Sequence, residues 1–284
     1  MGADRKYHFI SGLPRSGSTL LSAILRQNPA FDAGISSSLY SLVANAMSVM
    51  SGPDTRLIGE TRRANVLRGL FDSWAADLPP GKVVFDTNRY WTSQLPALLH
   101  LYPDAKVVCM VRNVAAVMDS IERVLRANPL LPARLFTDEE RANVYTRTAA
   151  LAQLNRLVGG PWSNLKEAFY GPYAKSLLLI EYDHLARAPA RVIELLYAFL
   201  GEAPFAHDFD NIDFDEPAFD EELRLPGLHK VMPKVELVPR TSTLPPDLYE
   251  RYSALNFWTD PAPSTAHLIV SQAGAAPAAP AASA

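Results

Sequence analysis

The sequence predicts an α/β fold in which a doubly wound parallel sheet is flanked by helices. Two observations lead to this prediction. Short apolar runs typical of buried parallel strands recur along the chain, and segments with helical periodicity separate them. Such alternation is typical of βαβ units, whose right-handed crossovers build a doubly wound sheet. The predicted strands are residues 7–10, 83–85, 107–111 and 177–180.

Helical patterns fill the intervals between these strands. Shorter ones follow three of the strands, at residues 18–27, 93–101 and 114–125. Two longer helical regions are insertions, at residues 36–76 with a break at Gly52-Pro53, and at residues 137–170 with a break at Gly159-Gly160-Pro161. We expect these helical insertions to form the walls of a substrate site.

Length and composition favour a single large domain. The chain has 284 residues, of which 48% are hydrophobic, enough for one substantial core. We expect one α/β domain over residues 1–259. From residue 260 the chain turns to Pro, Ala and Ser, a composition with little to bury, so residues 260–284 are predicted to be a disordered tail.

Charge and residue content limit the class of function. A formal net charge of −3 argues against nucleic-acid binding through overall charge. The polar start and the lack of an apolar run of about 18 residues predict a cytoplasmic protein without stable membrane insertion. The only cysteine, Cys109, allows no internal disulfide, and the scattered histidines have no metal-ligand spacing, so no metal is expected.

The loop after the first predicted strand carries the strongest functional signal. Residues 11–19 read Ser-Gly-Leu-Pro-Arg-Ser-Gly-Ser-Thr and lead directly into a predicted helix. Glycines let backbone amides approach an anion, and the helix start adds partial positive charge, so this loop resembles a P-loop. Ser18, however, stands where a nucleotide triphosphatase has lysine, and the cation of the loop is Arg15. The structural alternative is an ordinary glycine-containing turn.

These residues resemble the 5′-phosphosulfate loop of the sulfotransferases that use 3′-phosphoadenosine 5′-phosphosulfate (PAPS). The likeness is greatest to the bacterial and protein-tyrosine branches. The cytosolic branch has lysine in place of Arg15 and tryptophan in place of Leu20, so contacts to adenine are expected to differ here. The resemblance implies cofactor contacts from Pro14, Arg15, Ser16, Gly17, Ser18 and Thr19.

A second anion site is predicted downstream. Arg112 ends the third predicted strand, and Ser120 follows eight residues later on the next helix. Open α/β sheets bind ligands at the carboxyl ends of their strands, so both side chains can converge on one phosphate. The sulfotransferase 3′-phosphate site has an arginine and a serine at this spacing. Alternatively, Arg112 pairs with a surface carboxylate and Ser120 faces solvent.

Two further cofactor residues are implied by the resemblance. Tyr182, after the fourth predicted strand, matches an adenine-contacting tyrosine, although it is equally well explained as an ordinary half-buried residue. Arg240 lies in a basic stretch that resembles the mobile loop closing over the cofactor.

The candidate catalytic residues follow from the negative charge that grows on the leaving nucleotide. Arg15 is expected to stabilise that charge. The stretch after the second predicted strand lacks the histidine or lysine that relatives carry there, which leaves Asp86 as candidate base and Arg89 as charge stabiliser. Alternatively, Asp86 only orients Arg15 or Arg89, and His229 is an outside candidate for the base.

The sequence thus predicts a PAPS-dependent sulfotransferase that sulfonates an acceptor hydroxyl of a small molecule, lipid or glycan. Peptide tyrosine is disfavoured, because residues 35–38 read Ile-Ser-Ser-Ser where the tyrosine-modifying branch has a glutamate. The alternatives are a P-loop kinase or nucleotide triphosphatase, and a non-catalytic nucleotide-binding module.

Overall fold

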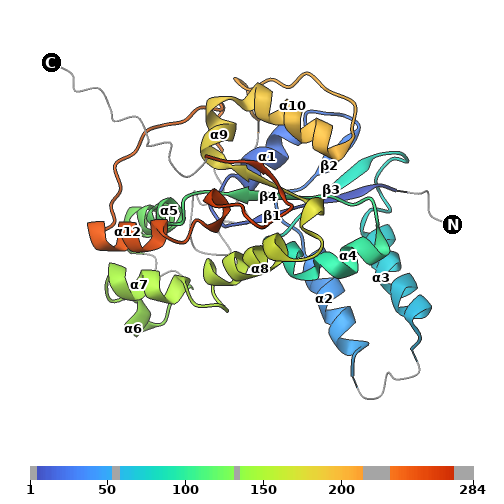
Figure 1. The fold of residues 1–284 in the computed structure, drawn as a ribbon, viewed down its shortest axis with the longest axis horizontal. Helices are drawn as coiled ribbons and strands as arrows, with labels where there is room; N and C mark the ends of the chain where they lie inside the picture. The colour runs from blue at the N-terminus through green and yellow to red at the C-terminus, as the bar shows by residue number, and fades with distance from the viewer. Residues whose placement is uncertain (1–4, 53–57, 131–134, 214–230, 272–284) are drawn as a thin grey trace.

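A parallel sheet of six strands forms the centre of the molecule (Figure 1). The computed structural model describes residues 5–52, 58–130, 135–213 and 231–271. The strand order is β2-β3-β1-β4-β5-β6, and every neighbouring pair is parallel. The strands are β1 (Tyr7–Gly12), β2 (Phe31–Ala33), β3 (Val83–Thr87), β4 (Val107–Val111), β5 (Leu177–Glu181) and β6 (His267–Ile269).

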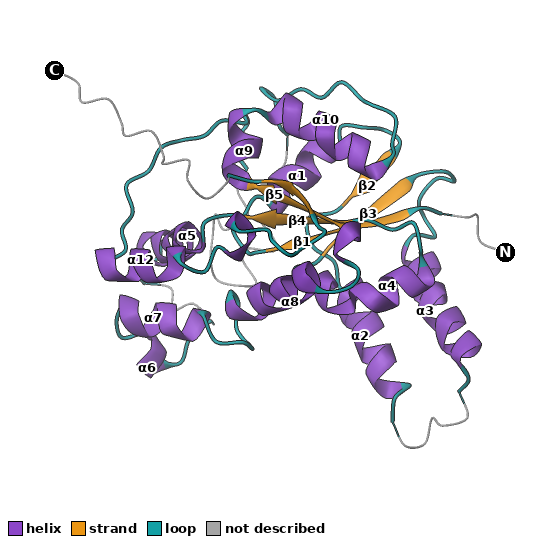
Figure 2. Ribbon diagram, in the orientation of Figure 1, coloured by secondary structure: helices purple, strands orange, loops and turns teal. Residues whose placement is uncertain are grey.

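Helices cover both faces of the sheet (Figure 2). One face is covered by α1 (Ser18–Leu25), α9 (Tyr182–Arg187) and α10 (Pro189–Leu200). The other face packs against α2 (Leu39–Val49), α3 (Glu60–Trp74), α4 (Leu95–Leu101), α5 (Val114–Ala127), α8 (Gly159–Tyr170) and α12 (Pro246–Ser253). Farther from the sheet lie α6 (Asp138–Arg141) and α7 (Val144–Leu151), and short 3₁₀ turns include η2 (Trp91–Gln94). The doubly wound α/β prediction is confirmed.

The strands are buried on both faces, which explains their continuous apolar sequences. In β4, Val107, Cys109 and Val111 face one hydrophobic cluster, while Val108 and Met110 face the other. Burial raises the pKa of Cys109, so this thiol acts as a small apolar side chain.

The central strands β1 and β4 form the switch point of the sheet. After β1 the chain enters α1 on one face, whereas after β4 it enters α5 on the opposite face. The two connections diverge from the carboxyl ends of adjacent strands, and a crevice opens at such a point. The predicted phosphate loop and Arg112 both lie there.

Three sequence predictions differ from the structure. The short edge strand β2 was not predicted. Gly159-Gly160-Pro161 begins α8 instead of breaking a helix, because the turn lies before it, at residues 152–158. The predicted tail starts too early, since β6 pairs with β5 beyond residue 260. Residues 272–284 lie outside the described residues.

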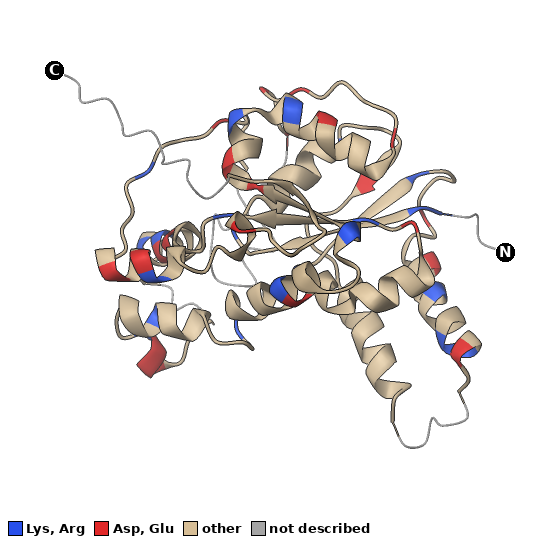
Figure 3. Ribbon diagram, in the orientation of Figure 1, with Lys and Arg blue, Asp and Glu red and all other residues tan. Residues whose placement is uncertain are grey.

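The longest insertion, α2 and α3, projects away from the sheet (Figure 1). Leu39 and Val43 anchor α2 in the core, whereas Leu42 and Val49 are exposed. No charged residue occurs in α2, and Figure 3 shows the contrast with the mixed charges of α3. Among the described residues, no helix has the length and apolar character needed to cross a membrane.

Candidate active site

The loop between β1 and α1 is held in a tight conformation by its backbone. Gly12 has φ 109° and Gly17 has φ 93°, both in the region that favours glycine, and Arg15 also has a positive φ of 58°. A Cβ on Gly12 would lie 2.1 Å from the carbonyl oxygen of Met110. Only glycine therefore fits at this position, where the last residue of β1 lies beside Met110 of β4.

Ser16 fixes the loop from inside. Its side chain is fully buried, and its hydroxyl contacts the carbonyl oxygens of Leu13 and, at 2.8 Å, Met110. The side chain of Ser16 is thus engaged within the loop, so toward a ligand this residue offers its backbone amide.

The remaining loop positions face outward. Pro14, Arg15, Gly17, Ser18 and Thr19 are partly exposed. No side chain caps the start of α1 at Gly17, and the first amides of any helix lack intrahelical partners. An anion at this helix start would meet free amide donors and the positive end of the helix dipole.

The two predicted phosphate motifs meet in space. Nε of Arg15 donates a hydrogen bond to Oγ of Ser120 at 3.1 Å, across 105 residues of sequence. Arg15 comes from the loop after β1, and Ser120 comes from the second turn of α5. The structure therefore brings the loop and the α5 serine to one site at the crevice.

Arg112 and Tyr182 complete this cluster. The Arg112 guanidinium lies over the Tyr182 ring, 4.5 Å from its centroid, and Nε of Arg112 is 4.0 Å from a carboxylate oxygen of Asp183. A Cβ on Gly17 would approach the same Tyr182 ring to 2.7 Å. Tyr182 is therefore packed between the loop and Arg112, a contact that the sequence did not indicate. Nε of Arg112 is buried with no hydrogen-bond partner among the described residues.

Asp86 occupies the carboxyl end of β3, and its side chain is almost fully buried. Its Oδ1 accepts a hydrogen bond from Nε1 of Trp91 at 2.6 Å, and its Oδ2 accepts one from the Ser37 hydroxyl. Burial raises the pKa of Asp86, and these two hydrogen bonds oppose the shift. The alternative in which Asp86 orients an arginine is not what the structure shows, since Ser37 and Trp91 are its partners.

Arg89 lies two residues beyond β3 and is partly buried. Burial lowers its pKa. Within the described parts of the chain, no carboxylate pairs with Arg89.

Arg240 is exposed and precedes a segment that is fixed to α5 through Asp119. The sequence reasoning missed Asp119, Ser37 and Trp91. For Asp119 a signal existed, because a carboxylate directly before the predicted phosphate-binding Ser120 requires a neutralising partner. His229 lies outside the described residues, and those residues contain no cluster of His, Cys, Asp or Glu that could hold a metal ion.

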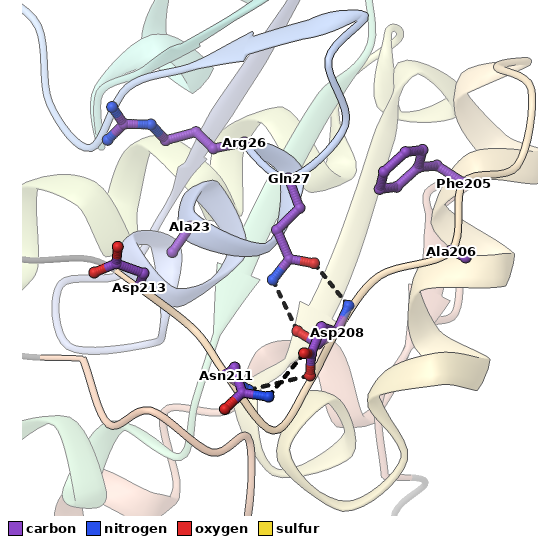
Figure 4. Close-up of a pocket in the computed structure, with 8 residues that line it drawn as sticks. All are labelled: Ala23, Arg26, Gln27, Phe205, Ala206, Asp208, Asn211 and Asp213. Carbon is purple, nitrogen blue, oxygen red and sulfur yellow. Dashed lines mark hydrogen bonds between the residues drawn. The ribbon is translucent and has the colours of Figure 1, made fainter.

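A groove elsewhere on the surface is unrelated to this cluster (Figure 4). It lies at the far end of α1, beside Arg26 and Gln27 and the segment 205–213. Gln27 and Asp208 close part of it with reciprocal hydrogen bonds of 2.8 and 2.7 Å. Ala23, the residue of α1 that lines it, lies five residues beyond Ser18, or about 8 Å of helix away from the loop. The contact of Arg15 with Ser120 and that of Arg112 with Tyr182 therefore mark the candidate site better than this groove does.

Comparison with known proteins identifies the class. The profile described as "Sulfotransferase family" matches residues 8–206, most of the chain, and this chain belongs to that family. No curated protein matches the sequence.

Solved sulfotransferase structures resemble the chain at low sequence identity. A sulfotransferase from Alicyclobacillus acidocaldarius is 20% identical, with a TM-score of 0.49 over 78% of this chain and 90% of that one. The sulfotransferase domain of the Synechococcus PCC 7002 olefin synthase is 18% identical, with a TM-score of 0.48 over 89% of this chain and 96% of that one. Mouse sulfotransferase SULT7A1, complexed with PAP, is 15% identical, with a TM-score of 0.48 over 91% of this chain and 86% of that one.

Proposed function

We propose that this sulfotransferase uses PAPS and transfers its sulfonate group to a hydroxyl of a small molecule, lipid or glycan, releasing 3′,5′-bisphosphoadenosine (PAP). The observation that carries the proposal is the hydrogen bond of 3.1 Å between Arg15 and Ser120. PAPS bears a phosphosulfate and a phosphate on one ribose, so its site needs two adjacent anion cradles. The loop after β1 and the start of α5 supply such a pair.

The 5′ end of the nucleotide is assigned to the loop of residues 14–19 and the start of α1. Backbone amides there, together with Arg15, offer donors to the phosphosulfate. The 3′-phosphate is assigned to Arg112 and Ser120. The Nε of Arg112 supports this assignment, because this buried atom lacks a hydrogen-bond partner in the described chain, and the nearest carboxylate, Asp183, is 4.0 Å away. Tyr182 is assigned to the nucleotide side through its contact with Arg112.

The proposed reaction is an in-line displacement at sulfur. The acceptor oxygen forms a new bond to sulfur while the bond from sulfur to the bridging phosphate oxygen breaks, and both bonding electrons leave with PAP. Negative charge grows on that bridging oxygen, and Arg15 is placed to stabilise it with a charged hydrogen bond. No step needs a metal ion, and metal independence stays a prediction.

Asp86 is the proposed base that takes the acceptor proton. Burial raises its pKa, which moves the carboxylate toward the range where a general base works best. Ser37 and Trp91 each occupy one acceptor position on its two oxygens, and each carboxylate oxygen has a second. The Ser37 and Trp91 contacts would then hold the base in one orientation.

Arg89 is the proposed second charge stabiliser. A partly buried guanidinium without a carboxylate partner in the described chain favours an anion nearby, such as the sulfonate in transit. A cytoplasmic location and the absence of nucleic-acid partners stay predictions from the sequence.

Calorimetric titration with PAP tests the nucleotide assignment. We expect binding without added metal, and about 100-fold or greater loss of affinity in Arg15→Ala and in Arg112→Ala, because each variant removes a charged hydrogen-bond donor. The matched control is Arg191→Ala, which removes an exposed arginine on α10 that pairs with Glu194. The control should bind PAP like the unmodified protein.

The same titrations, together with an assay of sulfonate transfer from labelled PAPS, separate the alternatives. Magnesium-dependent binding of ATP without binding of PAP would favour a kinase or nucleotide triphosphatase and contradict the proposal. Tight PAP binding without release of labelled sulfonate to a panel of alcohols, phenols and sugars would favour a non-catalytic binding module.

A further inference from the structure

The residue before Ser120 on α5 holds the C-terminal segment against the helix. Asp119 is buried, and its Oδ1 accepts hydrogen bonds from the Thr243 amide at 2.5 Å, the Thr243 hydroxyl at 2.8 Å and the Ser242 hydroxyl at 3.2 Å. The sequence separation between Asp119 and Thr243 is 124 residues. One carboxylate oxygen thus fixes two consecutive residues of a distant segment.

Arg123, one turn further along α5, completes the contact. Its Nε donates to Oδ2 of Asp119 at 2.7 Å, and its Nη2 donates to the carbonyl oxygen of Thr241. The Ser242 hydroxyl in turn accepts from the amide of Leu244 at 3.1 Å. We call Asp119, Arg123 and residues 241–244 the α5 dock.

The start of α5 is also bound to the C-terminal part of the chain. The Val114 amide donates to Oδ1 of Asn256 at 2.9 Å, and the Ser253 hydroxyl donates to Oδ1 of Asn113 at 3.2 Å. These contacts lie at the first turn of α5, whereas the α5 dock lies beside Ser120. Only the α5 dock therefore adjoins the serine that contacts Arg15.

The chemistry of Asp119 is unexpected for its position. A carboxylate beside a site for a phosphate dianion repels the ligand unless its charge is neutralised. Burial alone would raise the pKa of Asp119, but the hydrogen bonds from Arg123 and Thr243 outweigh it and lower that pKa. The carboxylate is thus kept ionised and turned toward the C-terminal segment.

We propose that Asp119 is a positioning residue: through the α5 dock it holds the segment that follows Arg240 and so places this arginine at the 3′-phosphate side of the nucleotide site. The proposal rests on the proposed function. It gives a supporting role in nucleotide binding to a residue that the family resemblance did not single out. In this proposal Asp119 contacts only protein groups, and the nucleotide contact is made by Arg240.

A second carboxylate on the same helix provides the matched control. Glu122 is buried and accepts hydrogen bonds from Arg126 at 2.8 Å and from Arg147 at 2.6 and 2.9 Å. Its partners lie on α5 and α7, and it makes no contact with residues 241–244 among those described. Removing Glu122 should lower stability without changing the nucleotide affinity of the folded protein.

The first experiment compares PAP affinity by calorimetry in Asp119→Ala and Glu122→Ala. We expect Asp119→Ala to weaken PAP binding about tenfold or more, since it removes several charge-assisted hydrogen bonds, while Glu122→Ala stays within about twofold of the unmodified protein. Equal affinities in Asp119→Ala and the unmodified protein would overturn the inference and leave the proposed function intact. If the unmodified protein binds no PAP, the proposed function fails, and with it the nucleotide role of Asp119.

The second experiment reads the position of the segment directly. Arg240 is exposed, so trypsin can cleave after it once the α5 dock opens. We expect cleavage between Arg240 and Thr241 to be about tenfold faster in Asp119→Ala, unchanged in Glu122→Ala, and slowed by PAP in the unmodified protein. Cleavage at the same rate in all three proteins would refute the dock.

A milder variant guards against loss of folding. Thr243→Val removes one hydroxyl hydrogen bond to Asp119 and keeps the pair between Asp119 and Arg123. It should shift both readouts in the same direction by about threefold to fivefold. A Thr243→Val protein that matches the unmodified one in both readouts would count against the inference.

Discussion

The two sides of the site are held in place by different parts of the chain. The loop after β1 owes its shape to backbone geometry, through Gly12, Gly17 and the buried hydroxyl of Ser16. The α5 dock owes its shape to side chains, chiefly the Asp119 carboxylate and Thr243. The loop tolerates almost no substitution at its glycines, whereas the α5 dock depends on a few side-chain hydrogen bonds that other polar residues can also form.

This difference explains why the sequence predicts the loop after β1 but not the α5 dock. A backbone-shaped loop requires glycines at fixed spacing within a few residues, so it leaves a local pattern. A side-chain dock joins residues more than 100 positions apart, so the sequence around Asp119 indicates that it needs a partner but not which residues supply it. Only the folded chain shows that they meet.

The comparison is tested most severely at Gly12. We expect Gly12→Ala to abolish folding or to lower the free energy of unfolding by about 3 kcal/mol or more, because the new Cβ would overlap the Met110 carbonyl and φ is 109°. Thermal unfolding followed by circular dichroism measures the change. Gly34→Ala is the matched control, since a Cβ there meets no atom within 4 Å. Equal stability of the two variants would show that the loop is more adaptable than its geometry implies.

The sequence predicted the fold through its strongest local patterns. The strands at the centre of the sheet are continuous apolar runs, and all four were placed correctly. Strand β2 covers only Phe31–Ala33, too few positions to show a pattern, and β6 lies in a stretch whose Pro and Ala content favours disorder. The sequence predicts a helix break at Gly159 and Gly160, but these residues allow close packing at the start of α8, where a Cβ on Gly159 would lie 2.2 Å from the Ala152 carbonyl oxygen.

The site was predictable to the same extent. Arg15 and Ser120 were expected at one sheet edge, and they form a hydrogen bond. The partners of Asp86 were not predicted, because Ser37 reaches it from the connection between β2 and α2 and Trp91 reaches it from η2. Their contacts depend on side-chain packing, which periodicity does not report. The roles of these residues in catalysis stay proposals.

Asp86 tests the same contrast between backbone and side chains, because it lies in strand β3 but is held in place by the side chains of Ser37 and Trp91. We expect Asp86→Asn to bind PAP normally and to lose about 100-fold or more in sulfonate transfer, since an amide cannot accept the acceptor proton. Single-turnover transfer from labelled PAPS measures the rate. An unchanged rate would exclude Asp86 as the base.

The Asp86→Asn variant should also change how the stability of the protein depends on pH. Burial raises the pKa of Asp86, so the folded chain binds its proton more tightly than the unfolded chain does. Stability should therefore fall as pH rises from about 4 through the folded-state pKa, and Asp86→Asn should lack this contribution. Melting temperatures of both proteins between pH 4 and 8 give the difference. A constant difference across this range would contradict the shift.

The smallest effect is expected at Arg240. This side chain is exposed, and exposed charges interact weakly and are screened by salt. Arg240→Ala should weaken PAP binding by about tenfold at low salt, the loss expected for Asp119→Ala, and this loss should shrink as salt is added. Calorimetry at two salt concentrations measures both values. A loss as large as that in Arg15→Ala would mean that the dock side contributes as much to binding as the loop.

The excursion formed by α2 and α3 leaves the sheet at β2 and returns at β3, two strands that lie next to each other. Its length and composition can change without shifting the register of either strand, since extending a connection raises its closure entropy only slowly. If this connection forms a wall of the acceptor site, as the sequence predicts, that wall can change while the strand ends to which the nucleotide is assigned stay in place.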